Sequence, residues 1–494
     1  MRRCTALALF AAAWLAMAGA APAAAGRTAL DEVFPDGLPF PFERVLERLR
    51  AEAGLDAVRT ALIPLGRSLQ RHSAAPDYFG SPRIVVAVSG DHAEGPGLPR
   101  LADRLYLGYV PAAAIVEAIS YDEAAGRFEF QEVVGYGLDR AWRTGTAERS
   151  ICLRCHQGEG PIFARPLWSE TNANPAVAAR LDALGPDFHG APVRQPIDEL
   201  DAFDASIDRA ARISVANRLW AEGCPDAECR AALFVAALRF GLNGARPDWR
   251  GGQSARGFDA RAATLWPDGL AVVSPDLPNR DPAGMLAAAD PGSLLDTTGP
   301  LNPETPRERI ALWRAGAEGF DAAAREIAAM LSPGDFAWLD VLMQSRDAPG
   351  RPLSLACTAG TASLGGDVET RFECGDGANR IEGFLRPGGG GRIDRLTIGG
   401  ADAPARIAVR MVLDGTAFRM EAVGPTPRLP DGARIGPLTL SGSEMRLAVV
   451  DDLTPVAAAL QARAREGSTA LASGPFRRRA LLMLVAEILG GENG

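Results

Sequence analysis

Helix-like and strand-like patterns of apolar residues organise the start of the chain. Residues 42–62 carry apolar side chains at helical spacing, and Pro64 is a natural stop for that pattern. Four later stretches rich in β-branched and aromatic residues predict strands: residues 83–88, 104–110, 115–121 and 126–134. The turn-like residues 121–127 join the last two of these strands. The pattern predicts an N-terminal α+β domain over residues 26–150, a small antiparallel sheet with one or two helices.

Helical spacing dominates the middle of the chain. Asn174-Pro175 is a capped helix start, and Gly185-Pro186 is a stop. Longer helices are predicted over residues 197–220, 227–240, 308–331 and 333–344. Residues 243–280 are rich in proline and glycine, which predicts an irregular stretch with one strand at 270–274. We expect a mainly helical domain over residues 151–350.

Short, regularly spaced strands return in the last part of the chain, residues 351–494. They are predicted over residues 353–358, 370–374, 380–385, 392–398, 406–413, 417–423 and 446–450, with glycine-rich turns between many of them. Such spacing is typical of a β-sandwich or half-barrel, and we expect a β-sandwich-like domain. Two helices follow, over residues 455–466 and 476–489. The second has only about half the apolar length of a membrane span, so we expect it to be a buried terminal helix.

The N-terminal segment, residues 1–25, has the pattern of a secretory signal peptide. Arg2 and Arg3 precede an apolar run over residues 6–20, and alanines at 23–25 offer a cleavage site. An uncleaved membrane anchor is the alternative, but the run is short for a span. We therefore expect a periplasmic or secreted protein with no stable membrane insertion after cleavage.

Charge excludes one class of partner. The formal net charge is −9, and removing the two signal arginines takes it to −11. An acidic chain is poorly suited to nucleic acid or to anionic membranes. Every basic residue is arginine, so a docking surface cannot be a ring of lysines.

The strongest chemical signal is Cys152-Leu-Arg-Cys155-His156, a C-x-x-C-H pentad. With 7 cysteines and 4 histidines in 494 residues, chance placement would give such a pentad with a probability of roughly 0.001. Two thiols three positions apart can add to the two vinyl groups of one porphyrin. The adjacent imidazole is then placed to bind the iron.

The pentad resembles that of c-type cytochromes, a resemblance confined to residues 152–163. It implies one covalent haem c, held by Cys152 and Cys155, with His156 as an axial iron ligand. In small cytochromes c, a proline after the motif lends its carbonyl to this histidine, and Gly160-Pro161 would do so here, which makes Pro161 a cofactor-binding candidate. Pro161 comes sooner after the histidine than in those proteins, and their glycine-aromatic helix is missing. The resemblance therefore implies a cytochrome c-like haem domain over residues 151–350, although it supports haem attachment more strongly than the small-cytochrome fold.

The number and spacing of the cysteines fit this interpretation. Signal cleavage would leave six cysteines, two of them in the pentad. The others form two neighbouring pairs that suit disulfides, Cys224 with Cys229 and Cys357 with Cys374. A zinc site made of the pentad cysteines with Cys224 and Cys229 is the alternative, although the second pair is widely spaced for it and His156 would be left unexplained.

The sixth iron ligand is not specified by a motif. No methionine occurs between His156 and Met285, and His189 is the nearest candidate downstream of the pentad. Met285, His72, His92 and an open, five-coordinate iron are the alternatives. Candidate pocket walls and propionate neighbours are Phe163, Trp168, Trp220, Arg154, Glu159 and Arg165.

The favoured function is electron transfer by an exported monohaem protein, with a redox partner protein or a small redox substrate. A peroxidase- or oxygenase-like haem enzyme with an open iron is the alternative, because an electron shuttle needs far fewer residues than this chain has. His189 or Arg165 would then be the distal acid–base group. A haem-carrying sensor or binding protein is a third hypothesis. We expect a multidomain α+β fold with the helical domain around the haem.

Overall fold

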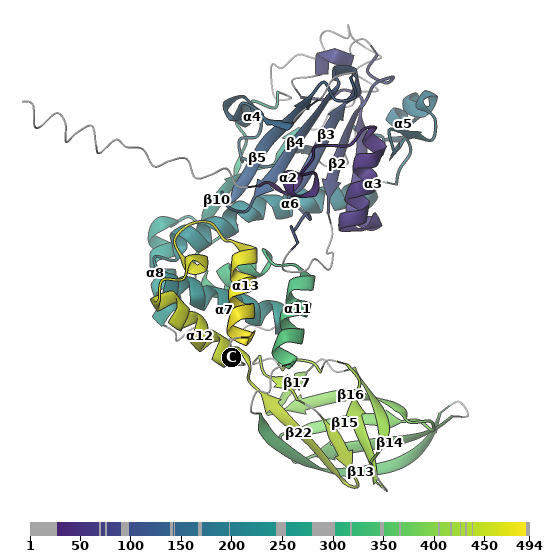
Figure 1. Cartoon of the computed structure of the whole chain (residues 1–494), viewed down its shortest axis with the longest axis vertical. Helices are drawn as coiled ribbons and strands as arrows, with labels where there is room; N and C mark the ends of the chain where they lie inside the picture. The colour runs from purple at the N-terminus through teal and green to yellow at the C-terminus, as the bar shows by residue number, and fades with distance from the viewer. Residues whose placement is uncertain are drawn as a thin grey trace, which may run out of the picture.

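The computed structural model has three parts along its longest axis: a six-stranded sheet, a group of helices and a β-barrel (Figure 1). It describes residues 27–490 apart from 69–70, 75–76, 90–97, 139–141, 143, 166–169, 197, 244–252, 279–301, 317–318, 346–349, 365–366, 404–405, 415–416, 425, 430–431 and 437. The predicted signal peptide, residues 1–25, lies outside the described residues. No helix in the described ranges combines the length and the apolarity needed to cross a membrane.

The N-terminal sheet is antiparallel, with its strands in chain order. They are β1 (Val58–Ile63), β2 (Arg83–Val88), β3 (Leu105–Val110), β4 (Ile115–Asp122), β5 (Arg127–Val134) and β6 (Thr144–Thr146). One face packs on the helices α2 (Ala29–Val33) and α3 (Phe42–Ala53) and on α5 (Pro175–Leu181). The other face packs on α6 (Asp198–Arg218) and the helical core. The four strands expected from the sequence are confirmed.

The helix predicted over residues 42–62 was too long. It ends at Ala53, because Gly54 takes a left-handed φ of 93° that suits a residue without a Cβ. The rest of the apolar run, Val58–Ile63, is β1 and pairs along its whole length with β2. A short apolar run bounded by glycine fits a buried strand as well as a helix, and pairing with β2 decides the outcome.

The helical part surrounds α7 (Ala227–Asn243), which packs against α8 (Gln253–Leu265), α10 (Gly319–Ala328) and α11 (Pro333–Gln344). The C-terminal helices α12 (Leu453–Arg465) and α13 (Arg478–Gly490) return from the barrel and join the same core. Two expectations were wrong here. Helix α8 lies in the stretch predicted as irregular, and the start of the helix predicted over 308–331 is strand β12 (Arg309–Trp313), paired with β10 (Leu270–Val273).

The C-terminal sheet closes into an eight-stranded antiparallel barrel, so the expected β-sandwich was wrong. Its strands are β13 (Arg351–Leu364), β14 (Asp367–Gly375), β15 (Arg380–Leu385), β16 (Gly390–Ile398), β18 (Ile407–Asp414), β19 (Ala417–Ala422), β21 (Thr439–Ser441) and β22 (Glu444–Val450). Closure comes from the long strand β13, which pairs with β14 through its second half and with β22 through its first half. One sheet that closes on itself needs no second sheet to cover its apolar face.

The remaining elements are short. They are the helices α4 (Arg149–Cys155), η1 (Leu55–Ala57), η2 (Arg71–Ala74), η3 (Pro111–Ala113), η4 (Asp182–Leu184), η5 (Leu219–Gly223) and η7 (Thr469–Leu471), and the strands β7 (Phe163–Arg165), β8 (Asp187–Phe188), β9 (Ala191–Pro192), β11 (Asp276–Pro278), β17 (Ala401–Ala403) and β20 (Arg434–Ile435).

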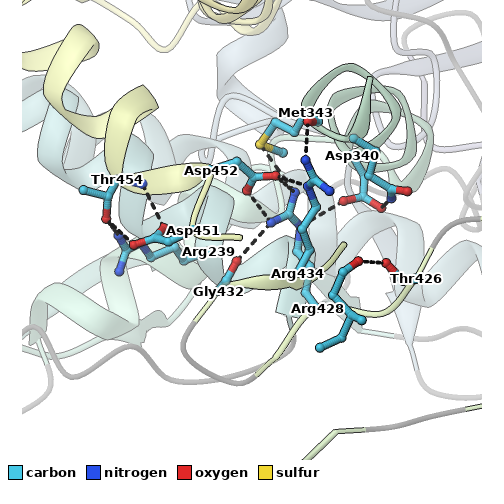
Figure 2. A network of polar contacts seen from close by, with 12 residues as sticks. Arg239, Asp340, Met343, Thr426, Arg428, Gly432, Arg434, Asp451, Asp452 and Thr454 are labelled. Carbon is cyan, nitrogen blue, oxygen red and sulfur yellow. Dashed lines mark hydrogen bonds and ion pairs between the residues drawn. The ribbon is translucent and has the colours of Figure 1, made fainter. Parts of the chain in front are cut away.

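A buried ionic network joins the barrel to the helical part (Figure 2). Asp452, which is fully buried, accepts hydrogen bonds from Nη1 of Arg428 at 2.7 Å and from Nε of Arg434 at 2.6 Å. Arg428 also donates through Nε to Asp340 of α11 at 2.9 Å, and Arg434 donates to the carbonyl of Met343 at 3.2 Å. These bonds tie the end of the barrel to both α11 and the start of α12.

Candidate functional site

The pentad forms the last turn of α4 and the residue after it. Figure 1 shows α4 beside β5, at one edge of the six-stranded sheet. Arg149 holds the helix there by donating to the carbonyl of Phe128 at 2.8 Å. Cys152 and Cys155 are three positions apart, so both thiols lie on one side of the helix. The structure thus presents the two thiols together next to His156.

The remaining described cysteines are engaged elsewhere. Cys224 is bonded to Cys229, and Cys357 is bonded to Cys374, which confirms both predicted disulfides. Neither pentad cysteine forms a disulfide. The alternative zinc site is therefore not supported, because two of its four sulfurs are bonded to each other. Among the described residues, no group of three or more His, Cys, Asp or Glu could hold a metal ion.

The Cys152 thiol is half-buried beside acidic residues. Burial, followed by the carboxylates of Glu117 and Glu132, raises the pKa of Cys152. The group therefore stays a neutral thiol at neutral pH, whereas a structural zinc site would need a thiolate.

The imidazole of His156 is held in one orientation. Its Nδ1 lies 2.8 Å from the carbonyl oxygen of Gly160, and a carbonyl can only accept, so Nδ1 carries the proton. Nε2 is then the basic nitrogen, the atom that would face an iron. The acceptor is Gly160, the residue before the predicted Pro161. Pro161 is buried and favours an extended Gly160, while Glu159 takes a left-handed φ of 62° that turns the chain back.

Burial also sets the charge of His156. It lowers the pKa of the imidazole to about 4 despite the bond to Gly160, and the positive charges of Arg83 and Arg307 act in the same direction. The ring packs on Phe130 with 5.2 Å between centroids. At neutral pH the imidazole is uncharged and one of its nitrogens keeps a lone pair, which is the form that binds a metal.

Residues 304–307, which are distant in sequence, are held against the pentad by hydrogen bonds and an ion pair. The Nε2 of Gln157 donates to the carbonyls of Glu304 and Thr305, each at 3.1 Å, and its Oε1 accepts from the backbone of Arg307 at 3.3 Å. Arg154 pairs with the carboxylate of Glu304 at 2.6 Å. Sequence reasoning placed Arg154 near propionates and did not single out Gln157, because the two segments lie far apart along the chain.

Arg83 belongs to β2 on the side of the sheet that faces His156. Its guanidinium crosses Gly108 of β3 to pair with Glu117 of β4 at 2.7 Å. A Cβ at Gly108 would collide with that guanidinium, so the glycine leaves the space that Arg83 occupies. Its Nε is buried and has no hydrogen-bond partner among the described residues.

Arg307 belongs to this segment, residues 304–307, and its side chain lies near the pentad. Its Nε donates to the carbonyl of Ser274 at 2.8 Å, and its Nη1 donates to that of Pro303 at 3.1 Å. Its Nη2 is buried and lacks a hydrogen-bond partner in the described part of the chain. Sequence reasoning named neither Arg307 nor Arg83, and no motif in the sequence marks them.

The predicted ligand His189 lies against the other face of the sheet. Its ring packs on Tyr109 with 5.4 Å between centroids, and its Nδ1 lies 3.4 Å from Oε1 of Glu43. Tyr109 belongs to the core under α3, whereas strand alternation puts Phe130, the contact of His156, on the opposite face. The structure therefore does not bring His189 to His156.

The other residues predicted to lie near the haem are found in several parts of the structure. Met285, His92 and Trp168 lie outside the described residues, His72 lies in η2, and Arg165 lies in β7. Phe163 follows the pentad and packs on Phe203 of α6, with 5.9 Å between ring centroids. Trp220 is part of the helical core. Glu159 pairs with Arg149 at 2.8 Å.

The residues present fit a covalent haem. The pentad offers two thiols, His156 offers a neutral nitrogen, and two nearby arginines have buried N–H groups without partners in the described structure. Comparison with protein-family models, curated proteins and solved structures finds no match to this chain. Its function is therefore inferred from its own residues.

Proposed function

We propose that this chain is an exported monohaem c-type protein that transfers single electrons. Cys152 and Cys155 would hold the haem by thioether bonds, and His156 would bind its iron. The observation that carries the proposal is the arrangement at the end of α4, where two thiols outside any disulfide adjoin a neutral imidazole fixed by Gly160.

The bound haem would supply a one-electron couple between ferric and ferrous iron. The chain's own contribution is to hold the imidazole still. Gly160 fixes one ring nitrogen, Phe130 packs on the ring, and Arg149 holds α4 on a sheet strand. A rigid ligand set suits electron transfer, because little has to rearrange when the iron changes its charge.

The attachment point is close to the surface. Cys152 and Cys155 are half-buried, whereas Ile151 and Arg154 beside them are exposed. An exposed isoleucine next to a charged residue is a suitable contact for a redox partner protein, the favoured partner class, and a small redox substrate would have access to the same side. The two disulfides support an oxidising compartment, in line with the expected export.

Optical spectroscopy of protein exported with c-haem maturation tests the proposal. We expect sharp low-spin bands on reduction and one one-electron wave in a redox titration. A high-spin spectrum that responds to added peroxide or oxygen would contradict electron transfer and favour the haem enzyme. A protein that carries no haem would contradict both functions.

A further inference from the structure

We infer that Arg307 binds a propionate carboxylate of the haem through its Nη2 group. This inference depends on the proposed function, since it concerns the same haem. It assigns to a residue far beyond His156 in the sequence the role of anchoring the cofactor and raising its midpoint potential.

The starting observation is a half-buried arginine, Arg307, whose buried Nη2 has no hydrogen-bond partner among the described residues. Two backbone carbonyls, from Ser274 and Pro303, accept from Nε and Nη1 of Arg307, while Nη2 has no described partner. Burial lowers the pKa of Arg307, while the charges of Cys155 and of the exposed Asp276 act in the opposite direction. A buried N–H group of a charged guanidinium is costly to leave without an acceptor, so the position of Nη2 suits an anion that a bound group brings to it.

Position assigns that anion to the haem. Oε1 of Gln157, the residue after His156, accepts from the backbone N–H of Arg307 at 3.3 Å. The guanidinium also lies within electrostatic range of the Cys155 thiol and the His156 ring. The cation is thus close to both an attachment point and the iron ligand, where a porphyrin bound to the pentad would bring its carboxylates.

Arg307 suits a carboxylate better than the second nearby arginine does. Arg83 already pairs with Glu117 at 2.7 Å, which largely compensates its charge. The two carbonyls that hold Arg307 fix the plane of its guanidinium and leave an N–H edge for a planar acceptor. A small carboxylate from solution has the same chemistry, and the test separates it from the propionate.

The inference predicts a change in redox potential. A positive charge beside the haem stabilises the ferrous state, which carries one positive charge less than the ferric state. Replacing Arg307 by glutamine removes that charge and leaves the propionate uncompensated, so the midpoint potential should fall. We expect the ratio of ferric to ferrous stability to change about tenfold, which is about 59 mV for a one-electron couple.

The experiment compares holoproteins of the wild type, Arg307→Gln and Arg309→Gln by redox titration and resonance Raman spectroscopy. Arg309 is the matched control, because it is an exposed arginine on β12 at the second position after Arg307. Arg307→Gln should lower the potential and shift the propionate bending band, while Arg309→Gln should change neither. Arg307→Lys keeps the charge, so its potential should stay near the wild-type value while the band shifts with the new donor.

Each result has a distinct meaning. A wild-type protein without covalent haem would contradict the proposed function itself. A haem-loaded Arg307→Gln with the wild-type potential and band would overturn the propionate assignment alone. If Arg307→Gln does not accumulate, Arg307→Lys decides, because an unchanged propionate band in that variant would also overturn it. A potential that changes with added acetate in the wild type would assign the anion site to a small carboxylate instead.

Discussion

Nδ1 of His156 lies 2.8 Å from the carbonyl oxygen of Gly160, a neighbour along the same stretch of chain. This bond fixes the tautomer, so that Nε2 is the nitrogen with a lone pair. Burial keeps the ring neutral, with a pKa of about 4, so no proton has to leave before a metal binds near neutral pH. The bond to Gly160 comes from the local chain, whereas the burial that keeps the ring neutral comes from the segments packed around it.

Removing one pentad thiol tests its role in attachment. Cys155→Ala should lose one thioether bond and most of the stably bound haem, since a single bond remains to Cys152. Haem per polypeptide, measured after denaturation, gives the result. The Cys224→Ala, Cys229→Ala double variant is the control, because it removes a disulfide outside the pentad and should keep its haem. Full covalent haem in Cys155→Ala would show that the pentad is not the attachment site.

His189→Ala tests our expectation that His189 is not the sixth ligand of the iron. His189 is held by Tyr109 and Glu43 on the face of the sheet away from His156. The reduced spectrum of the variant should therefore match that of the wild type. Loss of the low-spin bands in this variant would restore His189 as the ligand and would require the chain around the sheet to rearrange.

The buried carboxylate between the barrel and the helices should be essential for stability. Asp452→Asn leaves two buried guanidiniums without their shared charge, so we expect a loss of about 3–5 kcal/mol in unfolding free energy. Urea denaturation followed by circular dichroism measures the loss. Asp394→Asn is the control, an exposed pair with Arg392 at 2.6 Å for which we expect less than about 1 kcal/mol. Equal effects of the two substitutions would contradict the structural role of Asp452.

Tyr121 makes stability fall at alkaline pH. Burial raises its pKa from 10.0 to about 12, so between these values the folded chain keeps a proton that the unfolded chain loses. Stability from this group is therefore fully present below pH 10 and declines as the pH rises toward 12. Tyr121→Phe should be slightly less stable at pH 8, through loss of the bond from Asn217, and should lose less stability between pH 10 and 12. Parallel pH profiles of the two proteins would contradict this account.

Local signals in the sequence predicted much of this protein. The pentad and both cysteine pairs depend on residues that are close along the chain. The start of α11 was also predictable, because Ser332 and Asp335 form a capping box at its first turn. Such features are set by neighbouring residues and need no knowledge of the fold.

Long-range pairing accounts for what the sequence did not reveal. Whether β13 closes a barrel depends on its pairing with β22, the last of the barrel strands along the chain. Arg307 reaches the pentad because contacts with Gln157 and Arg154 hold its segment there, and these residues are far from it along the chain. His189 lies in the turn between β8 and β9, and the face of the sheet that it contacts depends on how this hairpin packs on Tyr109, which spacings along the chain do not show.

The most direct test of the central claim is the mass of the exported, denatured protein together with a map of its peptides. We predict the mass of the cleaved polypeptide plus one haem, with the added mass on the peptide that contains Cys152 and Cys155. A mass equal to that of the polypeptide alone, from cells that mature other c-type proteins, would contradict the claim.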